Sequence, residues 1–206
     1  MDHAAAKEDA THGYDASFTL RRARSLYFED NAFGDDGGYT KKWVPVQIGP
    51  ARIAIPNTAG RVRSVRLHDL HHIVTGYPTT LRGEAMMGAW ELGSGCADHY
   101  AAWYLNANAF AYGMVLGPRA LWRAFARGRR SKNLYGRPFD EALLERTVGE
   151  LREELLPDGD AAPGARDALA FGAWLLPGFY FLAWNLLSIP LALVVGFFTR
   201  GRVAAR

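Results

Sequence analysis

The residues most able to do chemistry lie in one stretch, RLHDLHHIVTGYPTTLRGE, at positions 66–84. His68 and His72 are four residues apart, so on a helix their imidazoles project from one face as neighbours. Asp69 lies one step round that helix, where it could bind the same ion or hold an imidazole by a hydrogen bond. Glu84 follows a short turn and falls in the first turns of a second, antiparallel helix that would face the histidine pair. These four side chains are therefore predicted to bind one divalent metal ion.

The donor set suits more than one metal. Two imidazoles with one or two carboxylates are typical of zinc and equally of an Fe(II) site with open positions for oxygen and substrate, and cobalt and manganese are further candidates. His71 is expected to lie behind the ligands or to face solvent. Glu91 is seven residues after Glu84 on the same helix face, so it is predicted to act as a catalytic acid or base. The alternative for Glu91 is an ion pair with an arginine.

Three motif families share parts of this pattern, and each lacks something here. His68-x-x-His71-His72 matches one histidine box of membrane desaturases, but those enzymes use about eight histidines, and this chain has six. The HD phosphohydrolase pattern requires a further upstream histidine on a folded helix. The zincin motif requires a glutamate where Asp69 stands. All three are disfavoured.

A fourth motif fits residue by residue. His68-Asp69-x-x-His72, followed after eleven residues by Glu84, resembles the metal motif of the Coq-four family of coenzyme Q (ubiquinone) biosynthesis. Other elements of that family resemble further stretches of this chain, namely Gly76–Thr79, Gly83-Glu84, Glu91, Gly128–Arg130, Asn133–Tyr135 and Leu151–Leu155. The resemblance covers about residues 62–156, as in a divergent bacterial-type member whose first 60 residues and apolar C-terminal segment differ.

The resemblance implies a mostly helical protein on the cytoplasmic or matrix face of a membrane. It also implies binding of a prenylated quinone precursor, a part in oxidative removal of the ring carboxyl group, and contact with other quinone biosynthesis proteins. We therefore expect a metal-dependent decarboxylase or oxygenase, classed as a lyase. The alternatives are a non-catalytic prenyl-lipid-binding scaffold and a hydrolytic metalloenzyme.

Hydrophobic periodicity and turn residues predict a mainly α fold, a compact helical bundle with a small N-terminal β-hairpin. A loose tail is expected over residues 1–17, a helical metal-binding domain over 18–156, a linker over 157–165 and a membrane-anchoring segment over 166–206. The expected elements within the domain are a helix over 18–28, a hairpin over 42–55, and helices over 62–75, 80–92, 97–127 and 139–156. The helix over 97–127 is expected to break near Gly117-Pro118.

The C-terminal segment carries the strongest physical signal. Residues 168–199 contain no charged side chain, and as one helix they would reach about 48 Å, more than the roughly 30 Å of a bilayer's hydrocarbon. Pro177 and Pro190 would kink such a helix. A tilted span, a hairpin and a foot lying on the membrane all fit, with the hairpin mildly favoured, and a core helical pair of a soluble protein is the alternative.

Composition narrows the partners and the compartment. The chain is 49% hydrophobic with a formal net charge of +3, which fits a folded protein near an anionic surface. The single cysteine, Cys96, requires no oxidising compartment, and the first residues do not resemble a secretory signal. We expect the cytoplasmic face of the inner membrane, with membrane lipid as a partner, no nucleic acid, and a homodimer as an option. The basic segment 122–132 suits lipid headgroups or plain solvation.

Apolar residues of the helix predicted over 97–127 offer one more choice. Trp103, Tyr104, Phe110, Tyr112 and Met114 could line a channel for an isoprenoid tail, or they could simply be core.

Overall fold

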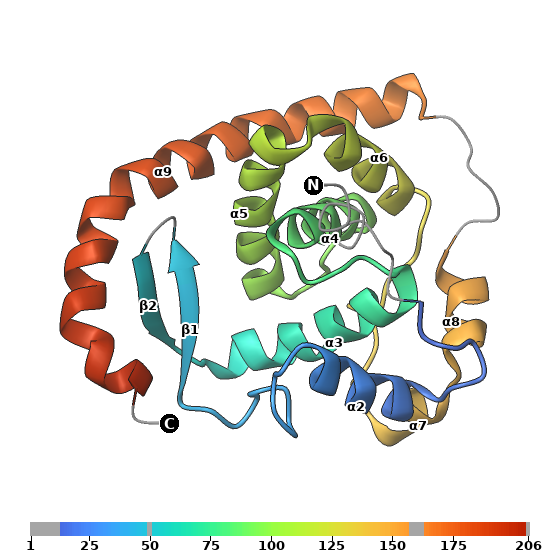
Figure 1. Cartoon of the computed structure of the whole chain (residues 1–206). Coiled ribbons are helices and arrows are strands. Elements are labelled where there is room, and N and C mark those ends of the chain that lie inside the picture. The colour runs from blue at the N-terminus through green and yellow to red at the C-terminus, as the bar shows by residue number, and fades with distance from the viewer. Residues whose placement is uncertain (1–12, 49–50, 157–162, 205–206) are drawn as a thin grey trace, which may run out of the picture.

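The computed structural model describes residues 13–48, 51–156 and 163–204. Helices dominate, as predicted, and the two described strands form one antiparallel pair (Figure 1). The elements in chain order are α2 (Leu20–Asp30), β1 (Trp43–Ile48), β2 (Ala51–Pro56), α3 (Ala59–Thr75), α4 (Leu81–Ser94), α5 (Tyr100–Leu116), α6 (Pro118–Gly128), α7 (Glu141–Glu145), α8 (Val148–Leu155) and α9 (Ala165–Ala204). Residues 157–162 of the linker predicted over 157–165, and most of the predicted N-terminal tail, lie outside the described residues.

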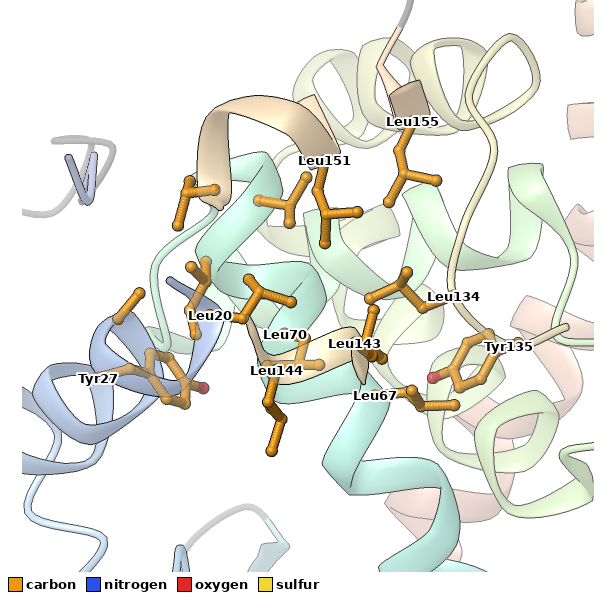
Figure 2. Packing of buried hydrophobic residues seen from close by; sticks show 14 of the residues in the cluster. Leu20, Tyr27, Leu67, Leu70, Leu134, Tyr135, Leu143, Leu144, Leu151 and Leu155 are labelled. Carbon is orange, nitrogen blue, oxygen red and sulfur yellow. The ribbon is translucent and has the colours of Figure 1, made fainter. Parts of the chain in front are cut away.

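Helix α3 is held by the larger hydrophobic core. Leucines from α2, α3, α7 and α8 point into one cluster, with Leu67 and Leu70 as the contribution of α3 (Figure 2). Both side chains are fully buried, and truncating such a leucine to alanine costs about 2–5 kcal/mol. Because this apolar side of α3 is fixed, the rotation of the helix about its axis is fixed too. The histidine side must therefore face away from the cluster, toward α4.

The turn between α3 and α4 is built as the sequence predicts. Gly76 ends α3 in the left-handed conformation, with φ of 78°, and its N–H donates to the His72 carbonyl. Thr80 caps α4 by accepting from the Gly83 N–H. A Cβ on Gly83 would lie 2.0 Å from the Pro78 carbonyl oxygen, so only glycine allows the turn to pack this closely on α4. The tight turn therefore places the next residue, Glu84, on the side of α4 that faces the histidines of α3.

The C-terminal end of α3 is satisfied by a side chain from α8. The Arg152 guanidinium donates to the carbonyls of Ile73 and Val74 and to that of Tyr14. The last carbonyls of a helix have no partner within the helix, so a cationic donor there stabilises it. Tyr14 belongs to the stretch predicted as a loose tail, yet it packs against the core.

The prediction of one continuous helix over 139–156 is wrong. The chain forms two short helices, α7 and α8, separated at Arg146 and Thr147. Thr147 is in extended conformation and caps α8, and Glu150 completes a capping box. The sequence contains this Thr147-x-x-Glu150 signature of a helix start, but the continuous stripe of leucines favoured a single helix. Glu154 of α8 forms ion pairs with two arginines, Arg137 and Arg146.

Helices α5 and α6 confirm the predicted break, since α6 begins at Pro118. Phe110 is fully buried in a second core cluster that joins α4, α5, α6 and α9. Trp103 stacks on Trp174 of α9 with 5.8 Å between ring centroids. Tyr104 meets Phe181 of α9 edge to face. Phe110 and Trp103 therefore agree with the core alternative, whereas Tyr104 contacts α9 but remains 54% exposed.

The apolar C-terminal segment is one helix, α9, so the mildly favoured hairpin is wrong. Both prolines lie inside it, and the helix arcs around the domain from α6, past α5, to the β-hairpin (Figure 1). Residues Ala165–Phe198 are long and apolar enough to cross a membrane, and their most apolar stretch of 18 residues has a mean hydropathy of 2.0 and is 17% buried. A core helix of a soluble protein would be mostly buried, so the exposed length favours an apolar environment outside the protein.

Candidate metal centre

Three side chains from two helices converge on one point. His68 Nε2 lies 3.1 Å from His72 Nε2 and 3.3 Å from Glu84 Oε2. His72 Nε2 lies 3.4 Å from Glu84 Oε1. The two imidazole planes are nearly perpendicular, at 84°. The predicted pairing of an α3 histidine pair with an α4 carboxylate is thus present, and these ligand atoms form a group that could hold a metal ion.

The Nδ1 nitrogens of His68 and His72 already have hydrogen-bond partners. His68 Nδ1 lies 3.1 Å from Glu91 Oε1, and His72 Nδ1 lies 2.7 Å from the Tyr77 carbonyl oxygen. A carboxylate and a carbonyl can only accept, so each Nδ1 carries the proton and donates. Each Nε2 then presents a lone pair to the shared point. Two lone pairs and a carboxylate facing one another repel unless a cation, a proton or a metal ion, lies between them.

The separations fit a metal as well as a proton. Bonds from zinc to nitrogen and to carboxylate oxygen are about 2.0–2.2 Å, so the edges of a tetrahedral site measure about 3.3–3.5 Å. The two Nε2 atoms lie 3.1 Å apart, and each lies 3.3 or 3.4 Å from a different oxygen of Glu84, so each separation is close to the length of such an edge. With one of these oxygens bound, the three side chains would fill three of the four vertices. The fourth vertex has no ligand from the three side chains. Two histidines and one carboxylate with an open position are typical of catalytic zinc and of non-haem iron sites.

Glu91 lies behind the site as a buried hub. Its side chain has 0% exposure, and its Oε1 accepts from His68 and, at 2.6 Å, from His71 Nδ1. Its Oε2 accepts from Tyr135 and Asn106. All its hydrogen-bond partners among the described residues are neutral or imidazole groups, so the predicted arginine alternative is not what the structure shows. The carboxylate fixes the orientation of His68, as acidic residues behind metal-bound histidines do.

His71 is fully buried, so the solvent-facing alternative is wrong. Its Nε2 accepts from the Leu134 backbone N–H at 2.9 Å, which leaves the proton on Nδ1 for Glu91. Neither nitrogen is free to reach the shared point. Tyr135 and Asn106, which complete the Glu91 contacts, were not singled out as site residues, because nothing in local spacing connects them to α3.

Asp69 is not brought to the shared point. Its Oδ2 accepts a hydrogen bond of 2.6 Å from the Tyr39 hydroxyl, in the loop between α2 and β1. Asp69 is buried, and burial raises its pKa despite the opposing effects of Tyr39, His68 and His72. The group of three ligands forms without it.

The site favours positive charge. Burial alone would lower the pKa of His68, but the carboxylates of Glu91 and Glu84 outweigh it and raise that pKa well above the usual value. The pKa of Glu91 is correspondingly far below its usual range, because His68 and His71 overcome the effect of burial. The pKa of Glu84 is lowered for the same reason by His72 and His68. In the absence of metal, His68 therefore holds a second proton, on Nε2, and a metal ion must displace this proton to bind there.

A cavity of about 200 Å³ has His72 in its wall, while His68 and Glu84 are not among its lining residues. Tyr27 and Tyr77 also line it, and the Tyr27 ring stacks on His72 at 5.8 Å between centroids. Burial, together with Asp69 and Glu84, raises the pKa of Tyr27, so its hydroxyl stays protonated. The cavity is large enough for a small ring or carboxylate group beside His72.

No family model, curated protein or solved structure matched this chain in the three comparisons made.

Proposed function

We propose that this chain is a membrane-associated metalloprotein of the Coq-four type. In this proposal it acts on a prenylated quinone precursor by oxidative decarboxylation or hydroxylation, at the cytoplasmic face of the inner membrane. The observation that carries the proposal is the convergence of His68, His72 and Glu84 on one point with both Nδ1 protons already used. The motif spacing supports the proposed family, and the exposed apolar helix α9 supports the proposed membrane association.

Each residue of the site has a role in this proposal. His68, His72 and Glu84 hold the ion, while Glu91 and the Tyr77 carbonyl keep the two imidazoles oriented. A divalent ion there supplies Lewis acidity or, if it is iron, redox chemistry with dioxygen. The cavity beside His72 receives the reacting ring or its carboxyl group. Glu91 has no exposed surface, so any acid–base effect it has reaches the substrate through His68.

Metal analysis of the purified chain tests the metal site. We expect close to one equivalent of a transition metal in the natural sequence and a loss of at least tenfold in His72→Ala, which removes a ligand. Asp98→Asn serves as a matched control, because this carboxylate is exposed and paired with Arg63 on the surface. Less than about a tenth of an equivalent in the natural sequence, unchanged in His72→Ala, would end the metal proposal.

Quinone-intermediate profiling in a strain that lacks the gene tests the reaction. The decarboxylation proposal expects a carboxylated, prenylated ring to accumulate, and complementation with a Glu84→Ala variant should fail to remove it. If that variant lost metal yet restored normal quinone levels, the chain would be a scaffold in which the ion only joins α3 to α4. Cleavage of ester or phosphoester probes would instead indicate a hydrolase.

A further inference from the structure

Helix α9 has two different apolar faces. Its inner face packs on the domain through Phe171, Trp174 and Leu175 in the second core cluster. Further along, Phe181 meets α5, and the helix then runs beside β2. Its outer face carries a stripe of large apolar side chains at helical spacing, namely Leu169, Leu176, Tyr180, Leu187, Leu191 and Phe198. Leu187 is 80% exposed, and Leu176 and Phe198 are 77% and 79% exposed.

The polarity of α9 is reversed relative to a helix at a water-exposed surface. Asn185, the one side-chain amide between positions 168 and 199, is buried and points inward, where it donates to Asn108 of α5. In water, a surface helix places amides outward and apolar residues inward. In hydrocarbon, an outward amide would lose its hydrogen bonds, so polar groups turn toward the protein. The arrangement therefore indicates lipid outside α9.

The packing also indicates how α9 meets the lipid. Because α9 is joined to the domain from α6 to the hairpin, a helix standing across the bilayer would take α5, β1 and β2 into the hydrocarbon (Figure 1). The described sheet has only two strands, so each strand has one edge without a strand partner. Open sheet edges do not occur in the hydrocarbon of a membrane. If only the outer stripe of α9 enters the lipid, the sheet stays outside the hydrocarbon and this cost does not arise.

The two helices against which α9 packs, α5 and α6, also expose apolar and basic side chains. Tyr104, Val115 and Leu116 of α5 are exposed. Trp122 of α6 contacts Phe171 of α9, and α6 also exposes Arg119 and Arg123. Tyrosine and tryptophan favour the headgroup level, and each basic residue near an anionic surface contributes roughly 1 kcal/mol.

We infer that α9 enters one leaflet of a membrane without crossing it, inserted by its outer stripe at the middle of its arc, around Leu187, with anionic headgroups beside the arginines of α6. The occupant of the exposed face is thus a lipid surface. This inference rests on the proposed membrane association, but neither on the metal nor on the reaction.

Depth measurement in vesicles of phosphatidylcholine and phosphatidylglycerol tests the inference. Nitroxide labels are placed at Leu176→Cys, Leu187→Cys and Phe198→Cys in the full chain, each carrying Cys96→Ala. Because α9 is curved, insertion of its outer stripe into one leaflet puts the label at 187 deepest and the labels at 176 and 198 at similar, shallower depths on the same side. A spanning helix separates the first and last labels by about 33 Å, at opposite interfaces. A depth that changes steadily in one direction from 176 through 187 to 198, or a label at 198 reached only from the far side, would overturn the inference.

A charge-matched pair of variants tests the surface itself. Leu187→Asp should weaken vesicle binding at least tenfold, whereas Ala142→Asp, on the exposed side of α7 remote from α9, should leave it unchanged (Figure 1). Equal binding to vesicles without phosphatidylglycerol would remove the headgroup part of the inference. If the natural chain bound no vesicles and formed a dimer that Leu187→Asp dissociated, a second copy would be the occupant, and the membrane association itself would fall.

Discussion

The Glu91 carboxylate offers the sharpest test of how the candidate metal centre is built. In Glu91→Gln, the amide oxygen can still accept from His68 and His71 at the position of Oε1, while the amide nitrogen replaces Oε2. The nitrogen then meets the Asn106 amide donor, although the Tyr135 hydroxyl can rotate to accept. The bond to His68 remains but loses its charge, and charge-assisted hydrogen bonds are roughly twice as strong as neutral ones.

The expected effect is on metal affinity. Removing a group that orients a metal-bound histidine typically costs 10–100-fold in affinity, or about 1.4–2.8 kcal/mol. The pH dependence carries a second signature. Glu91 also raises the pKa of His68, so in the variant that pKa falls and a proton competes less with the metal. The deficit of the variant should therefore be largest near pH 8.5 and shrink toward pH 6.

Competition between the protein and a chromophoric zinc chelator measures this directly. Tyr135→Phe is the matched control, because it removes one hydrogen bond to Oε2 and leaves both the charge and the His68 contact. We expect a change of less than about threefold for that control. If Glu91→Gln melted like the natural chain and bound zinc within twofold of it at pH 8.5, then Glu91 would not act on His68 as described.

Three further predictions concern the ligand set, the packing and the acid stability of the fold. Asp69→Asn should keep the metal within about threefold, because its carboxylate is directed to Tyr39 and not to the shared point, and metal analysis measures this. Gly128→Ala should lower the free energy of unfolding by about 2 kcal/mol or more, since its Cβ would lie 2.1 Å from a backbone oxygen of α4. Gly60→Ala, whose Cβ meets nothing within 4 Å, should instead stabilise by up to about 1 kcal/mol, and thermal melts of the pair decide. Ion pairs with two arginines lower the pKa of Glu154 to about 2, so its contribution, about 1 kcal/mol, is present above pH 4.5 and lost as pH falls toward 2. A Glu154→Gln variant should therefore lose less stability on acidification between those values, and equal loss would contradict the assignment.

Local rules predicted much of the fold. Thr80, Gly76 and Pro118 mark helix ends by backbone chemistry that depends on a few neighbouring residues, and each end was found as expected. The break between α7 and α8 was missed although Thr147 and Glu150 signalled it, because a continuous apolar stripe does not show that the backbone extends between two helices.

The sequence by itself determined the ligand face and the apolar character of the C-terminal segment. Four-residue spacing places His68 and His72 side by side on any helix, and a run of 32 residues without a charged side chain is long and apolar enough to cross a membrane. Tertiary structure alone decided that Glu91 turns its whole carboxylate inward, that Asp69 bonds to Tyr39, and that α9 lies along the domain as one helix. These are contacts between residues far apart in the chain, and they depend on how the cores fix the rotation of α3, α4 and α9, which no local spacing specifies.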